Sequence, residues 1–185
     1  MLDLQTIDKN WTLFLDRDGV INHEKEGDYI YNAAEFVFYD GVTAALKLLE
    51  RRFGDVILVT NQRGIGKELM TELDLMDIHN HMLKKIEGAG GRIDAIYYCT
   101  SIDNQHPDRK PQPGMALKAK EDFPAIDFSK SVMVGNKMSD MLFGRNAGMH
   151  TVYLQTTHPD QPLPNPAIDL AFKSLLNFAE ALAAK

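Results

Sequence analysis

Cysteine is almost absent from this chain. Cys99 is the only one among 185 residues, so an internal disulfide is excluded. A single cysteine fits a reducing compartment, and we therefore expect a cytoplasmic protein. No apolar run approaches the roughly 18 residues that a membrane-spanning helix needs. The N-terminal stretch MLDLQTIDKN has early acids and no long apolar core, so we expect neither a signal peptide nor a membrane partner.

An excess of positive charge is also lacking, because 26 acidic residues outnumber 20 basic ones and the formal net charge is −6. Such a surface is a poor match for polyphosphate backbones, and no stretch combines basic with aromatic residues, so we expect no nucleic-acid partner. The 44% hydrophobic and 25% charged content is typical of a globular protein. A length of 185 residues is ample for one core and short for two, which predicts a single domain over residues 1–185.

Patterns typical of strands and helices alternate along the chain. This alternation predicts an α/β fold with a mostly parallel sheet covered by helices on both faces, a Rossmann-like three-layer sandwich. No insertion is long enough to be a cap domain, so the 23–39 segment and the 100–113 loop should form the rim of any site at the sheet edge. We expect strands up to Asp16 and at 56–60, 92–99, 131–135 and 150–154, with helices at 41–52, 71–87, 114–122, 138–147 and about 173–184.

Two residues are positioned to begin helices. Asp40 precedes the 41–52 segment and can cap it, and Thr71, with Asp74 three residues later, predicts a capped start for the longest helix. Residues 156–167 contain four prolines and predict a surface loop.

The segment FLDRDGVIN, residues 14–22, is the most informative in the chain. An apolar run stops at Asp16, Asp18 follows two positions later, and Gly19 allows a turn. Residues i and i+2 of an extended segment project to the same side. Two carboxylates held that close either share a proton or bind a cation, because like charges disfavour joint ionisation. A solvated acidic turn is the alternative.

Later strands supply partners for these acids. ILVTNQ (57–62) ends on Thr60 and Asn61, and SVMVGN (131–136) ends on Asn136, with Asp140 four residues on. Ligands of open parallel sheets bind at the carboxyl ends of the strands, so these positions should converge.

Four motifs together resemble those of the haloacid dehalogenase-like (HAD-like) phosphohydrolases. They are Asp16-Arg17-Asp18-Gly19, Thr60, Lys110 in the Arg109-Lys110-Pro111 segment, and Gly135-Asn136-Lys137-Met138-Ser139-Asp140. The stretches DRDGVIN, VTNQRGIGKE and RKPQPGM are similar to those of the small histidinol-phosphate and D-glycero-D-manno-heptose-1,7-bisphosphate phosphatases. This resemblance covers nearly the whole chain, and capless members of the family are often monomers.

The resemblance implies a role for each motif residue. Asp16 would be the nucleophile that forms an aspartyl-phosphate, and Asp18 the acid and base for the leaving group and the water. Thr60, the main chain of Asn61 and Lys110 would hold the phosphate. Mg²⁺ would bind the Asp16 carboxylate, the Asp18 carbonyl and Asn136, with Asp140 orienting a metal-bound water.

Several of these residues have ordinary alternatives. Thr60 can simply end a strand, and an isolated lysine such as Lys110 is usually solvated. Arg109 matches an arginine that the relatives use on substrate, and the Asn61 side chain is a candidate for substrate hydroxyls. Arg63 stands where the relatives carry a small residue; we expect it to point into water, with a substrate anion as the alternative.

The chain departs from the family pattern at two places. Asn136 stands where the fourth motif normally has an aspartate, so Mg²⁺ loses a negative ligand. The relatives also hold a structural Zn²⁺ on a Cys/His loop, but here the corresponding CTSIDNQHPDRKP keeps only Cys99 and His106. Structural zinc needs four ligands, so we expect none.

Together with this resemblance, the sequence predicts a Mg²⁺-dependent phosphomonoesterase that hydrolyses a small phosphorylated metabolite, with a heptose bisphosphate favoured. Histidinol phosphate is the alternative substrate. A phospho-ligand-binding relative with impaired catalysis, motivated by Asn136, is the alternative function, and a nucleic-acid end phosphatase is disfavoured by the net charge.

Overall fold

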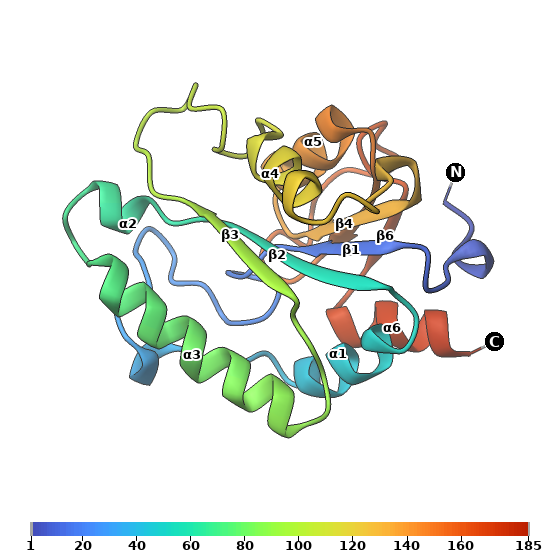
Figure 1. The fold of residues 1–185 in the computed structure, drawn as a ribbon, viewed down its shortest axis with the longest axis horizontal. Coiled ribbons are helices and arrows are strands. Elements are labelled where there is room, and N and C mark those ends of the chain that lie inside the picture. The colour runs from blue at the N-terminus through green and yellow to red at the C-terminus, as the bar shows by residue number, and fades with distance from the viewer. Residues whose placement is uncertain (1, 185) are drawn as a thin grey trace.

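Six strands form one sheet in the computed structural model, which describes residues 2–184 (Figure 1). Their order is β3-β2-β1-β4-β5-β6, and every neighbouring pair is parallel. The predicted α/β architecture is confirmed. The bounds are β1 (Thr12–Leu15), β2 (Asp55–Asn61), β3 (Ala95–Cys99), β4 (Ser131–Gly135), β5 (His150–Leu154) and β6 (Leu170–Phe172).

Helices cover both faces of this sheet, with α1, α3 and α6 on one side and α4 and α5 on the other (Figure 1). Leu13 and Leu15 of β1 face the first layer, whereas Phe14 faces the second, as the two-residue repeat of a strand requires. The bounds are α1 (Val42–Glu50), α2 (Arg63–Gly66), α3 (Glu72–Gly88), α4 (Gly114–Asp122), α5 (Met138–Ala147) and α6 (Leu175–Ala183), with short 3-10 turns at Leu4–Thr6, Ala33–Glu35 and Phe128–Lys130.

The register of the central strands brings their carboxyl ends to one edge. Leu15 is paired with Leu58 of β2 and with Val134 of β4. The backbone N–H of Asp16 then donates to the Val134 carbonyl at 3.0 Å. The polar residues that follow β1, β2 and β4 consequently lie at the same edge of the sheet.

Two local predictions are wrong. The third strand begins at Ala95 rather than at residue 92, because the Asp94 carboxylate accepts the N–H of Val56 at 2.8 Å, where a longer strand would continue the ladder. The first helix is preceded by Gly41 at φ +76°, without a side-chain cap from Asp40. The short elements α2 and β6 were not predicted.

The start of α3 is confirmed. Thr71 accepts the N–H of Asp74, and the Asp74 carboxylate accepts the N–H of Thr71, so two free donors of the first turn are satisfied. Over residues 2–184, every helix is either too short or too polar to cross a bilayer.

Candidate active site

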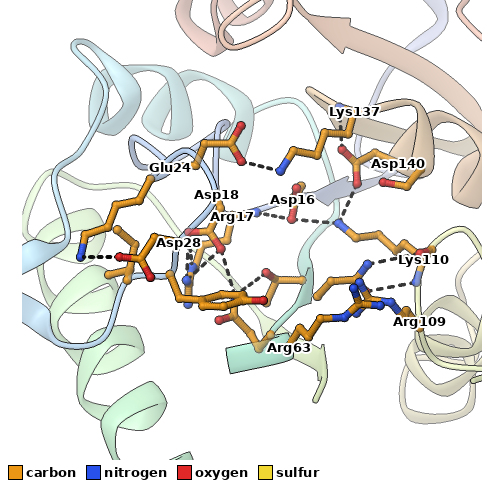
Figure 2. A pocket seen from close by; sticks show the side chains of 17 residues that line it. Asp16, Arg17, Asp18, Glu24, Asp28, Arg63, Arg109, Lys110, Lys137 and Asp140 are labelled. Carbon is orange, nitrogen blue, oxygen red and sulfur yellow. Dashed lines mark hydrogen bonds and ion pairs between the residues drawn. The ribbon is translucent and has the colours of Figure 1, made fainter. Parts of the chain in front are cut away.

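Lys110 lies at the centre of the site. Its ammonium group is 2.8 Å from Asp16 Oδ1 and 2.8 Å from Asp140 Oδ1 (Figure 2). It also donates to the Val59 carbonyl at 2.9 Å. All three side chains are almost completely buried. The structure thus brings together Asp16, which follows β1, and Asp140, in the helix that follows β4, as their positions after strands predict. Lys110 joins them from the loop before α4, a residue that only the family resemblance indicated.

Burial and charge act in opposite directions on this cluster. Burial, opposed by the ammonium group of Lys110, raises the pKa of Asp16 to about 7. Burial alone would lower the pKa of Lys110, but Asp140 and Asp16 outweigh it and raise that pKa above its usual value. Lys110 therefore stays charged, and Asp16 is in balance between its two protonation states near neutral pH.

Asp18 is held by a different set of donors. Arg17 donates from Nη2 to both carboxylate oxygens at 2.9 Å, Asn22 donates to Oδ1 at 2.9 Å, and Gln62 donates to Oδ2 at 3.0 Å. Burial would raise the pKa of Asp18, but these donors, Arg17 first, outweigh it and lower the pKa. Arg17 itself is buried, with Nη1 3.3 Å from His79 Nε2.

Thr60 and Asn61 are placed at the end of β2 and line the pocket. The Thr60 hydroxyl accepts a hydrogen bond from Gln62 Nε2 at 2.8 Å, so Gln62 connects it to Asp18. The Asn61 amide donates to the Lys110 carbonyl at 3.2 Å and accepts the Lys110 N–H at 3.1 Å. The Asn61 side chain thus fixes the backbone of the lysine, which the sequence did not indicate.

Asn136 is completely buried beside the turn at Gly19. Its Nδ2 donates to Thr157 Oγ1 at 2.6 Å and lies 3.4 Å from Glu24 Oε1. Its Oδ1 has no hydrogen-bond partner within the part of the chain that the structure describes. A Cβ on Gly19, which has φ +85°, would lie 2.0 Å from Asn136 Nδ2, so only glycine fits this close approach.

Asp140 contributes both of its oxygens to the site. Oδ1 contacts Lys110, and Oδ2 accepts the backbone N–H groups of Asn136 at 3.2 Å and Lys137 at 3.0 Å. Asp140 therefore connects the start of α5 to Lys110.

Asp16, Asp18, Thr60, Lys110 and Asp140 line a cavity of about 250 Å³, whereas the completely buried Asn136 is not among its lining residues. The 23–39 segment contributes Glu24, Lys25 and Asp28 to its rim, and Glu24 forms an ion pair with Lys137 (Figure 2). The expectation that this segment forms part of the rim is confirmed.

Arg63, the first residue of α2, and Arg109, in the 100–113 loop, line the same cavity. Arg63 Nη2 donates to the Ile102 carbonyl at 3.1 Å and also contacts Asn104. The prediction that Arg63 points into water is therefore wrong. The sequence contained an indication that Arg63 belongs to the site, because this arginine directly follows the Thr60-Asn61-Gln62 stretch at a strand end.

Other residues of the site were not singled out from the sequence. Each of them contacts a residue of a motif. Arg17 and Gln62 donate to Asp18, and Glu24 pairs with Lys137. The loop residues Thr156 and Thr157 contact Gly19 and Asn136. Thr156 donates to the Gly19 carbonyl at 2.6 Å. Arg17, Gln62 and Lys137 lie inside or next to the motifs, whereas the two threonines carry no recognisable sequence signal.

Cys99 and His106 lie together, with Sγ 3.7 Å from Nδ1. In residues 2–184 no group of three or more Cys, His, Asp or Glu side chains is arranged to hold a metal ion. The absence of Zn²⁺ stays a prediction.

Comparison with known proteins agrees with this geometry. The family model described as HAD-hydrolase-like matches residues 108–175. The D-glycero-alpha-D-manno-heptose-1,7-bisphosphate 7-phosphatase of Mycobacterium bovis is 34% identical over 93% of this chain and 91% of its own length. The enzyme of the same name from Campylobacter jejuni is 38% identical over 79% and 83%.

A solved structure extends the likeness to the fold. The D,D-heptose 1,7-bisphosphate phosphatase from B. bronchiseptica, crystallised with magnesium and phosphate, superposes with a TM-score of 0.85 at 27% identity, covering 94% of this chain and 98% of that one. Fold, site and relatives define a HAD-like phosphatase, a hydrolase acting on phosphoric monoesters. Within that class, the chain belongs to the D-glycero-D-manno-heptose-1,7-bisphosphate 7-phosphatase family.

Proposed function

We propose that this protein removes the 7-phosphate of a D-glycero-D-manno-heptose 1,7-bisphosphate. The names of the relatives supply the substrate class, and the contact of Lys110 with Asp16 and Asp140 at the base of the cavity is the observation that carries the chemistry. Because the relatives described above are heptose bisphosphate phosphatases, we prefer this substrate to histidinol phosphate.

Asp16 is the proposed nucleophile. One of its oxygens attacks phosphorus, the bond from phosphorus to the sugar oxygen breaks, and an aspartyl-phosphate results. Lys110 favours the ionised form of Asp16 and offers positive charge to the phosphate oxygens. Thr60 lines the same cavity and is the proposed hydroxyl donor to the phosphate.

Asp18 is the proposed proton carrier. It gives a proton to the departing sugar alkoxide and later accepts one from the water that attacks the aspartyl-phosphate. In the free protein the lowered pKa of Asp18 keeps its carboxylate ionised. Burial raises this pKa, but the hydrogen-bond donors outweigh burial, and the charge of Arg17 is the largest lowering effect. An arriving phosphate dianion raises that pKa, because a like charge disfavours the carboxylate, and so favours uptake of the proton that is donated.

The oxygen donors at this edge fit Mg²⁺. Asn136 Oδ1 is buried and lacks a partner among the described residues, which is the condition expected of a ligand atom without its cation. The Asp16 carboxylate and the Asp18 carbonyl complete a set of hard oxygen ligands, and Asp140 is the proposed outer partner. When bound, Mg²⁺ would neutralise charge on the transferring phosphate. Asp16 supplies the one carboxylate among the proposed direct ligands, so we expect Mg²⁺ to bind weakly.

Turnover tests this proposal. Purified protein is assayed for phosphate release from heptose 1,7-bisphosphate, other sugar phosphates and histidinol phosphate, with Mg²⁺ titrated, beside Asp16→Asn. We expect hydrolysis of the heptose bisphosphate, with a loss of at least about 10³-fold in the variant.

Two results would contradict it. Preferred hydrolysis of histidinol phosphate would replace the substrate. Binding of phosphate esters without release of phosphate, even at high Mg²⁺, would favour a binding protein whose catalysis is impaired by Asn136.

A further inference from the structure

Within residues 2–184, two arginines of the cavity lack the acidic partners that its other cations have. Four of its basic residues contact a carboxylate: Arg17 with Asp18, Lys25 with Glu35, Lys110 with Asp16 and Asp140, and Lys137 with Glu24. For Arg63 and Arg109, no carboxylate of residues 2–184 lies within ion-pair distance.

The two guanidinium groups lie near one another. Figure 2 shows both on the side of the cavity opposite the Glu24–Lys137 pair. Burial, and then the charge of Arg63, lowers the pKa of Arg109. Arg63 Nε is buried and has no acceptor in the described part of the chain. The positive charges of Arg63 and Arg109 are therefore held close together, and Arg63 Nε remains available as a hydrogen-bond donor.

Contact with the neighbouring loop does not account for this pair. Arg63 donates to Ile102 and Asn104, and Arg109 donates to the Ser101 carbonyl at 3.3 Å. Neutral donors would serve these acceptors equally well, without the repulsion between two cations. Guanidinium groups are suited to phosphate, because their planar N–H donors match its oxygens in pairs and carry a permanent charge.

We infer that Arg63 adds a second cation, beside Arg109, to the subsite that binds the phosphate of the bisphosphate that is not cleaved. The inference rests on the proposed function, since it assigns the second phosphate of that substrate. Arg63 is then a specificity-determining residue: it separates bisphosphate from monophosphate substrates, and Asp16 and Lys110 act on the phosphate that leaves.

The test compares two substrates that are both cleaved at C7, heptose 1,7-bisphosphate and heptose 7-phosphate. In Arg63→Gln we expect the ratio of kcat/KM for the bisphosphate to that for the monophosphate to fall roughly 10–100-fold, as for loss of a charged hydrogen bond. Arg63→Lys should restore part of the ratio. Asn104→Ala is the matched control, because it removes a loop contact of Arg63 and leaves the charge, and its ratio should stay close to that of the wild type.

A direct binding measurement separates this inference from the proposed function. Heptose 1-phosphate, which carries only the phosphate assigned to this subsite, is titrated calorimetrically into wild type and Arg63→Gln. We expect roughly 10–100-fold weaker binding in the variant. Equal binding in both proteins, an equal kinetic loss on both substrates, or the same loss in Asn104→Ala would overturn the subsite. A wild-type protein that binds heptose 1-phosphate through Arg63 but hydrolyses neither ester would overturn the proposed function alone.

Discussion

Asn136 combines complete burial with an unpartnered oxygen, and both properties follow from its neighbours. Thr157 and Glu24 face its Nδ2, so the amide is oriented with Oδ1 away from them. A carboxylate at this position would face Glu24 with a like charge, whereas an amide donates to it. Compared with an aspartate, Asn136 therefore attracts a cation less strongly, but it can donate to Glu24 in the 23–39 segment.

Replacing Asn136 with aspartate should strengthen the cation site. We expect Asn136→Asp to bind Mg²⁺ at least about 10-fold more tightly, because a negative oxygen replaces a neutral one. The measurement is the thermal unfolding midpoint across a Mg²⁺ titration, since binding to the folded state raises it. Unchanged Mg²⁺ affinity would mean that position 136 is not a ligand.

Gly19 should be irreplaceable for two separable reasons. Alanine there costs about 1–2 kcal/mol of folding free energy from the left-handed backbone alone, and its Cβ would also overlap the Asn136 amide. Gly27→Ala is the control, because Gly27 has φ +70° with nothing within 4 Å of an added Cβ. Urea unfolding of both variants gives the difference, and an equal loss of stability would show that the overlap is relieved without strain.

Asp16 should make the metal-free protein less stable as the pH rises. Its folded pKa of about 7 exceeds the unfolded value of roughly 4, so the stabilising contribution is complete below pH 4 and is lost between pH 4 and 7. In Asp16→Asn this loss should be missing. Urea unfolding with a chelator present checks it, and parallel pH profiles for the two proteins would refute the assignment.

Among the helices and strands, β6 shows where local sequence patterns are insufficient. Leu170–Phe172 is only three residues long and half-buried, so it has no recognisable strand pattern. It is held by pairing with β5 and by Asp169, which contacts Arg145 at 2.8 Å and accepts the N–H of Thr151 at 2.9 Å. Longer elements, such as α3 with its Thr71 cap, contain enough local signal to be predicted.

Asp169→Asn should weaken this edge of the sheet in a pH-dependent way. Burial would raise the pKa of Asp169, but Arg145 and Thr151 lower it, so its contribution is present above pH 4 and is lost as the pH falls further. We expect a loss of about 1–2 kcal/mol at pH 7 and a smaller one at pH 3. Urea unfolding at pH 7 and pH 3 measures this loss of stability, and Asp160→Asn, at an exposed position, is the control. An equal loss at the two pH values would exclude an ionic contribution of Asp169.

For the protein as a whole, the charge balance predicts that nucleic acid is not a partner. The net charge is −6, and most cations of the cavity are engaged by acids. We expect no salt-sensitive binding of a phosphorylated oligonucleotide at physiological ionic strength, since few phosphates could be neutralised. Fluorescence anisotropy checks this, and tight binding that weakens with salt would revive a nucleic-acid substrate. The single domain, monomeric state and cytoplasmic location stay predictions.

The residues at the strand ends were identifiable from the chain alone. Asp16, Thr60 and Asn136 each follow an apolar run, and parallel strands necessarily end at one edge of the sheet, so local pattern and general geometry sufficed to place them together. The supporting contacts were not identifiable. Whether Asn61 holds Lys110, Thr157 holds Asn136 or Arg63 enters the cavity depends on how distant loops pack over that edge, and no local pattern encodes such long-range packing.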